Sequence, residues 1–141
     1  MPRRAFFVGS LLLLLLIGAA VLLRPAIATT EKGSRLLVLL RWQSGRIQFV
    51  NSVTGRPVAI RFRVGTAFDR FAMTTDPATE EYYTNGVYRL NDVTSTQSTN
   101  ALRFCSMNGI HLTLGFHDLD VRNGCLEVKL LWTPCSGASC T

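Results

Sequence analysis

The stretch Ile47–Val64 reads IQFVNSVTGRPVAIRFRV and contains two short runs in which apolar and polar residues alternate. Successive side chains of a β-strand point to opposite faces of the sheet, so this alternation predicts two strands, each with one buried face. In the second run Arg61 and Arg63 stand between the apolar positions, which predicts a basic outer face. The connection Asn51–Pro57 is rich in Asn, Ser, Gly and Pro, the usual turn residues. The stretch therefore predicts a hairpin with an open, polar connection.

Short alternating runs recur along the rest of the chain. They predict strands near 102–104, 110–114, 119–121 and 126–130, separated by Asn-Gly turn signals. Val87–Leu90 is a further candidate strand, whereas Leu36–Leu40 fits either a strand or the continuation of a helix. About seven short strands at this spacing predict an all-β fold, a small antiparallel sandwich or barrel.

Two segments between these strands carry different signals. Thr79–Tyr83 predicts a short helical turn, because Asp76 and Thr79 can cap it and the glutamates favour a helix amino end. Asn91–Asn100, with the sequence NDVTSTQSTN, predicts a solvated loop or an exposed edge.

The first 28 residues form a separate, apolar unit. Ala5–Leu23 carries no charge and would extend about 28 Å as a helix, close to the hydrocarbon thickness of a bilayer. The sequence Ala26-Ile27-Ala28 fits cleavage by signal peptidase, while the length of the run fits an uncleaved anchor equally well. We therefore expect residues 1–28 to form an N-terminal hydrophobic helix that is either a signal peptide or a membrane anchor. Residues 29–141 should be a single exported β domain that begins with a polar linker at Thr29–Ser34. The domain would be periplasmic, either membrane-anchored or secreted.

The charge balance argues against a nucleic-acid partner. The chain has 15 Lys and Arg against 9 Asp and Glu, a formal net charge of +6, and three of the arginines belong to the N-terminal segment. The remaining excess is small, so no nucleic-acid partner is expected.

The four cysteines suggest disulfide bonds in an oxidising compartment. They are Cys105, Cys125, Cys135 and Cys140. The first two fall at strand ends of adjacent hairpins, and a bridge closing a loop of about 20 residues would stabilise the fold by about 3 kcal/mol. The last two could form a second, small bridge. Because the spacing of cysteines and histidines does not match a metal site, neither a metal nor another cofactor is expected.

The residues that could bind a ligand gather around the hairpin. Arginine side chains match carboxylate and phosphate groups, but they also keep an exposed strand face soluble. Tyrosines beside a polar loop form either a binding platform or the edge of a core. The candidate ligand-binding set is Arg46, Asn51, Ser52, Arg56, Arg61, Arg63 and Tyr83. No catalytic motif is present, and a hydrolase using Ser52 or one of the histidines, His111 and His117, is the third-ranked alternative.

The segment FVNSVTGRPVAIRF, Phe49–Phe62, resembles the domain of unknown function 1850, a family of small exported bacterial proteins. The features that carry the resemblance are Phe49, Asn51, Ser52-Val53 and Pro57-Val58, although members often have His in place of Asn51. The resemblance implies an N-terminal hydrophobic segment, a small β domain, and proximity to tripartite, binding-protein-dependent uptake systems for small acids.

These observations favour a non-enzymatic accessory or interaction domain on the extracytoplasmic side of a membrane. Its expected partners are a membrane protein and, through the N-terminal segment, the membrane itself. The alternative is a small anionic-ligand binding protein.

Overall fold

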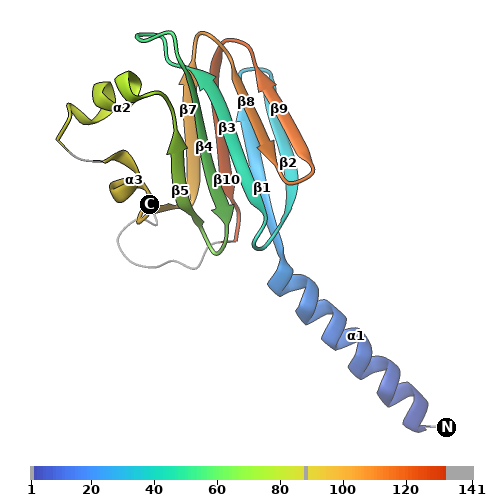
Figure 1. Cartoon of the computed structure of the whole chain (residues 1–141). Coiled ribbons are helices and arrows are strands. Elements are labelled where there is room, and N and C mark those ends of the chain that lie inside the picture. The colour runs from blue at the N-terminus through green and yellow to red at the C-terminus, as the bar shows by residue number, and fades with distance from the viewer. Residues whose placement is uncertain (1, 88, 133–141) are drawn as a thin grey trace, which may run out of the picture.

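The computed structural model describes residues 2–87 and 89–132, which form three helices and two antiparallel sheets (Figure 1). The elements in chain order are α1 (Pro2–Leu22), β1 (Leu23–Thr30), β2 (Gly33–Leu40), β3 (Ser44–Val50), β4 (Pro57–Val64), β5 (Phe68–Thr74), α2 (Pro77–Thr84), α3 (Leu90–Thr94), β6 (Ser98–Thr99), β7 (Ala101–Ser106), β8 (Ile110–Leu114), β9 (His117–Val121) and β10 (Gly124–Leu130).

The ten strands divide into a four-stranded and a six-stranded sheet. The strand order is β2-β1-β10-β7 in the first and β6-β5-β4-β3-β8-β9 in the second, with every pair antiparallel. The predicted hairpin is confirmed as β3 and β4, which pair from Ser44 with Arg63 to Val50 with Pro57. The all-β prediction is thus confirmed as a mostly β fold with two antiparallel sheets.

One hydrophobic core joins the two sheets. Its buried side chains include Leu37 and Leu126 from the first sheet and Ile47, Phe62 and Leu112 from the second. Removal of this apolar surface from water is the main stabilising contribution to such a fold. In β4, Val58, Phe62 and Val64 are buried while Arg61 is exposed, as the alternation predicts.

The β domain begins earlier than the sequence suggests. Leu23–Thr30 is strand β1, which lies between β2 and β10 and pairs with both. Ala26 and Ala28, the small residues of the predicted cleavage motif, are 0% and 2% exposed in the core. The predicted polar linker 29–34 is instead the end of β1, a turn and the start of β2. Cleavage itself stays a prediction.

The strand count also differs from the predicted number of about seven. The described residues form ten, because β1, β5 and the two-residue edge strand β6 were not predicted, and Leu36–Leu40, left open between strand and helix, belongs to β2. The predicted strand Val87–Leu90 is wrong: Val87 lies outside any strand and Leu90 begins α3. The segment is helical rather than extended because Asn91 holds α3 against β5. Its side chain accepts a hydrogen bond from the backbone N–H of Met73 and donates one to the carbonyl of Met73.

The predicted helical turn is confirmed as α2. Asp76 is its N-cap and accepts hydrogen bonds from the backbone N–H groups of Ala78 and Thr79. Asn91–Asn100, predicted as a loop or an exposed edge, contains most of α3 and the edge strand β6.

The helix α1 projects away from the sheets (Figure 1). Its large apolar side chains from Phe7 to Leu22 are exposed, and β1 follows the last helical residue directly. Within residues 2–87 and 89–132, no helix is long and apolar enough to cross a membrane.

Candidate functional site

The connection between β3 and β4 is organised by a buried asparagine. Asn51 is 6% exposed, and its Oδ1 accepts hydrogen bonds from the backbone N–H groups of Val53 (2.8 Å) and Thr54 (3.0 Å). Its Nδ2 donates to the hydroxyl of Tyr83 in α2 at 2.7 Å. An asparagine that bonds to the backbone two and three residues onward is a common way to stabilise a turn. Asn51 therefore fixes the turn and fastens α2 to it.

A cavity of about 320 Å³ lies beside this turn. It is lined by the predicted residues Asn51, Ser52 and Tyr83 and by Cys105 and Cys125. The side chains of Asn51 and Tyr83 bond to each other. Ser52 is exposed, and its hydroxyl is available to bind a ligand.

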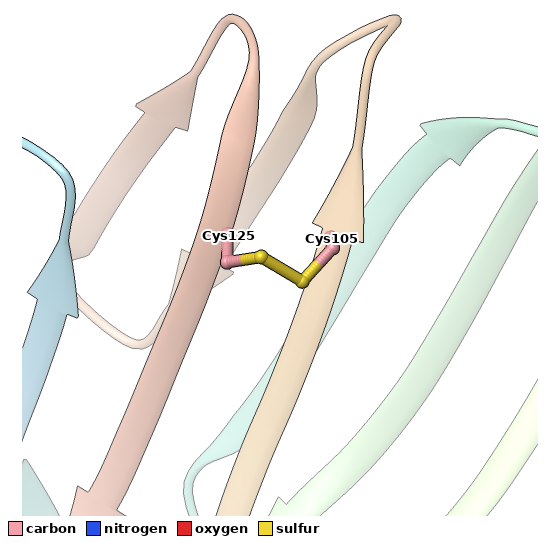
Figure 2. The surroundings of a disulfide bond; sticks show 2 residues. All are labelled: Cys105 and Cys125. Carbon is pink, nitrogen blue, oxygen red and sulfur yellow. A yellow bond between two sulfur atoms is a disulfide. The ribbon is translucent and has the colours of Figure 1, made fainter.

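The two cysteines of this cavity form the predicted disulfide bond. Cys105 in β7 and Cys125 in β10 are paired directly across the two strands (Figure 2). Cys105 is therefore not a free nucleophile for a Cys–His pair. Cys135 and Cys140 lie outside the described residues, so the second predicted bridge stays a prediction.

A larger groove of about 950 Å³ lies on the second sheet, beside β3, β4, β8 and β9. The strand register explains its composition, because Gln48 of β3 lies opposite His111 of β8, which in turn lies opposite Asp120 of β9. The polar residues that line it include Arg46, Gln48, Arg56, His111, Asp120 and Arg122.

A histidine in this groove is held by two side chains. The Nδ1 of His111 lies 2.6 Å from the Oδ1 of Asp120, and its Nε2 lies 3.2 Å from the hydroxyl oxygen of Thr113. A carboxylate only accepts hydrogen bonds, so the Nδ1–H of His111 donates to Asp120, and the second contact, to Thr113, fixes the orientation of the ring. The side chains of His111 and Asp120 are 43% and 74% exposed, so the pair faces solvent on an open sheet surface.

Asp76 adds a carboxylate at the rim of the same groove. The hydroxyl of Thr79 donates to its Oδ2 at 2.6 Å, and this bond, with those from the backbone, lowers the pKa of Asp76 below its ordinary value. Asp76 thus keeps its negative charge opposite the arginines of the groove.

The structure divides the predicted set into three groups. Arg46 and Arg56 line the groove, and Asn51, Ser52 and Tyr83 line the small cavity. Arg61 and Arg63 line neither, although Arg61 lies directly opposite Arg46 in the β3–β4 register. The predicted basic face is therefore present, but only part of it borders the groove.

Of the polar residues that line the groove, the candidate ligand-binding set contained Arg46 and Arg56. It lacked, among others, Gln48, Asp76, His111, Asp120 and Arg122. The alternation did place His111 and Asp120 on polar strand faces. Only the pairing of β8 with both β3 and β9 brings them to the arginines, and this register is not visible in any local pattern.

The structure does not bring Ser52 to either histidine. His111 bonds to Asp120 and Thr113, and the Nε2 of His117 lies 3.1 Å from the carbonyl oxygen of Val38. Within the described ranges, no three His, Cys, Asp or Glu side chains are grouped so that they could hold a metal ion.

Comparison with known proteins adds no relative. No family model, no curated protein and no solved structure matches the chain. The resemblance of Phe49–Phe62 to the domain of unknown function 1850 stays a prediction.

Proposed function

We propose that this protein is an exported, non-enzymatic β-sandwich domain that acts as an accessory or interaction module at the extracytoplasmic face of a membrane. The observation that carries the proposal is the direct passage from α1, with its exposed apolar side chains, into β1, an inner strand of the first sheet. A helix of this kind needs an apolar environment, and the β domain must then lie immediately beside it.

Two further observations support this location. The Cys105–Cys125 bond is compatible with an oxidising compartment outside the cytoplasm. The resemblance of Phe49–Phe62 supports a tripartite uptake transporter as the membrane complex that the domain serves.

The proposal is tested by locating the full chain and its neighbours in cells that produce it. We expect the protein in the membrane fraction, with a residue of the exposed hairpin turn accessible to a reagent that does not cross the membrane. A photo-cross-linker placed at Ser52 should capture a membrane protein, whereas the same group on the apolar helix, at Leu14, should capture lipid. Recovery of the chain from the cytosol, or failure to capture any protein from the hairpin turn, would contradict the proposal.

A second candidate function is the binding of a small anion in the groove. It is favoured by Arg46, Arg56 and Arg122, three guanidinium groups around one hollow that match carboxylate or phosphate geometry.

A thermal-shift measurement with inorganic phosphate and succinate tests this candidate. A ligand that binds only the folded protein raises the melting temperature by mass action. Arg46→Gln and Arg56→Gln should remove the shift, and Arg70→Gln, an exposed arginine outside the groove, is the matched control. An equal shift in all three variants would exclude the groove.

A further inference from the structure

Three segments of the chain meet at the end of the β domain from which α1 emerges. They are the turn 41–43 between β2 and β3, the turn 115–116 between β8 and β9, and residues 131–132 after β10. Backbone hydrogen bonds fix these segments. The Arg41 N–H donates to the carbonyl of Leu22, the last residue of α1 (2.8 Å), the Leu131 N–H to that of Pro25 in β1 (2.9 Å), and the Gly115 N–H to that of Ser44 in β3 (3.3 Å). This end of the domain is called the helix-proximal end below.

Each of these segments presents an aromatic side chain to solvent. Trp42 is 57% exposed, Phe116 87% and Trp132 56%. Trp42 and Trp132 are also the two tryptophans of the chain. Large apolar residues are costly to leave in water, and tryptophan in particular is enriched where a protein meets lipid headgroups.

Two arginines, Arg24 and Arg41, lie at the same end of the domain. Arg24 follows α1 by two residues, and Arg41 is bonded through its backbone to Leu22. The Nε atoms of both are buried and have no hydrogen-bond partner within the described part of the chain. The guanidinium of Arg41 also lies 5.1 Å from the ring of Trp42. Guanidinium groups beside exposed aromatic rings suit an anionic headgroup next to an apolar layer.

The apolar surface continues from α1 onto the outer face of the first sheet. Leu36, Val38 and Leu40 of β2 are 62%, 52% and 42% exposed. They lie opposite Ile27, Pro25 and Leu23 of β1 in the strand register, so six apolar residues share one face. The apolar helix, the aromatic turns and this face thus adjoin one another.

The opposite end of the domain has a different composition. Its turns carry Glu31, Lys32, Asn108, Arg122 and Asn123, all exposed. The turns there expose the apolar residues Val53 and Met107, neither of them aromatic. The exposed aromatic side chain of this end is Tyr82 in α2, which carries a hydroxyl and is 50% exposed.

We propose that the helix-proximal end is a lipid-binding face for an anionic phospholipid bilayer. Trp42, Phe116 and Trp132 enter the interfacial region, and Arg24 and Arg41 bind lipid phosphates. This inference rests on the proposed membrane location but adds the surface, its residues and the lipid charge it recognises.

The two tryptophans provide a direct test. The full chain is reconstituted into vesicles of phosphatidylglycerol and phosphatidylcholine, with and without lipids brominated near the headgroup end of the acyl chain. We expect bromine to quench most of the tryptophan fluorescence and the emission to shift to the blue. Emission of fully hydrated tryptophan with no quenching, in vesicles that carry the protein, would overturn the inference.

A matched variant moves the fluorophore to the other end. Met107→Trp in a Trp42→Phe, Trp132→Phe background keeps aromatic rings at the helix-proximal end and puts the one tryptophan at the polar end. We expect this tryptophan to stay unquenched. Quenching as strong as in the natural chain would mean that bromine reaches the whole domain and would contradict a specific face.

The arginines are tested by the charge of the lipid. An arginine near an anionic surface contributes about 1 kcal/mol, so Arg24→Gln and Arg41→Gln should each reduce the docked population about fivefold on anionic vesicles. The same variants should match the natural chain on phosphatidylcholine alone. If the arginine variants lose the same docked population on both kinds of vesicle, Arg24 and Arg41 do not bind the anionic headgroup.

Flotation of the vesicles separates the two proposals. If the full chain does not float with them, the proposed membrane location and this inference both fail. If it floats and the tryptophans are unquenched, the location stands and only the lipid-binding face fails.

Discussion

At the scale of single residues, the side chain of Asn51 makes three hydrogen bonds, two within the hairpin turn and one to Tyr83 of α2. Asn51→Ala would leave two backbone N–H groups and the Tyr83 hydroxyl without their partner in a nearly buried site. Unsatisfied groups of this kind cost about 1–3 kcal/mol in the free energy of unfolding. Urea denaturation of the full chain in mild detergent measures the loss. Ser52→Ala, at the exposed neighbouring position, should stay within about 0.5 kcal/mol of the natural chain. Equal losses for the two variants would contradict the structural role of Asn51.

Asp76 links stability to pH. Since the pKa of Asp76 is lowered in the folded state, chiefly by the Thr79 hydroxyl, its stabilisation is present above the carboxyl's unfolded-state pKa. It is lost as the pH falls through the lower, folded-state pKa. Asp76→Asn keeps a capping oxygen but does not titrate, so the natural chain should lose more stability than this variant on acidification to about pH 3. Thermal unfolding of both proteins across this range checks the sign. Parallel curves would contradict it.

The candidate site was predictable from the sequence only in part. The outward positions of Arg46 and Arg61 follow from strand alternation, which is a local property. The structural use of Asn51 was not predictable, because it depends on Tyr83, which lies 32 residues further along the chain. The pairing of β8 with β3, which brings His111 and Asp120 beside Arg46, joins segments far apart in the sequence, and a local pattern does not contain it.

At the scale of elements, the bridge between β7 and β10 should stabilise the first sheet. It spans a sequence separation of 20 residues, and closing a loop of about this length contributes about 3 kcal/mol on the chain-entropy view. Replacing Cys105 and Cys125 together by Ser should lower the free energy of unfolding by about that amount. Peptide mapping without reductant checks the pairing. Unchanged stability in the double variant would contradict a structural role for the bond.

The strand β1 should be indispensable to the β domain. It lies between β2 and β10, and its Ala26 and Ala28 are buried. A chain that begins at Leu23 should therefore keep its sheets, whereas a chain that begins at Thr29 should expose two strand edges and part of the core. Circular dichroism and limited proteolysis of the two truncations compare them directly. A stable, protease-resistant chain beginning at Thr29 would contradict the importance of β1.

β1 could not be predicted from the sequence, for a physical reason. The apolar run of α1 passes into Leu23–Ala28 with only Arg24 and a proline as interruptions, a composition that also suits the end of an export signal. The partner strand β10 is about a hundred residues away in the sequence, and such a pairing leaves no periodicity in the segment itself. β1 and β2 are also neighbours joined by a short turn, but their apolar runs lack the regular alternation that made the hairpin β3–β4 predictable.

At the scale of the whole molecule, the two ends of the domain should respond differently to lipid. We expect hydrogen exchange at Trp42, Gln43 and Phe116 to slow when the full chain moves from detergent to anionic vesicles, because these turns leave the water phase. Exchange at Val53 and Met107, on the opposite end, should not change. Mass spectrometry of peptides from both turns measures the difference. Uniform slowing across the domain would speak for general compaction instead.

The junction between Leu22 and Leu23 has no spacer. Under the membrane location proposed above, this sets the height at which the β domain stands over the lipid. A seven-residue strand such as β3 extends about 23 Å, so the polar turns stand little more than one strand length above the base of the domain. With α1 held in a bilayer, the domain cannot search a large volume as a module on a flexible tether does. A partner that binds the hairpin turn must therefore reach it within about one strand length of the base of the domain. A complex in the same membrane meets this condition more readily than a freely diffusing protein.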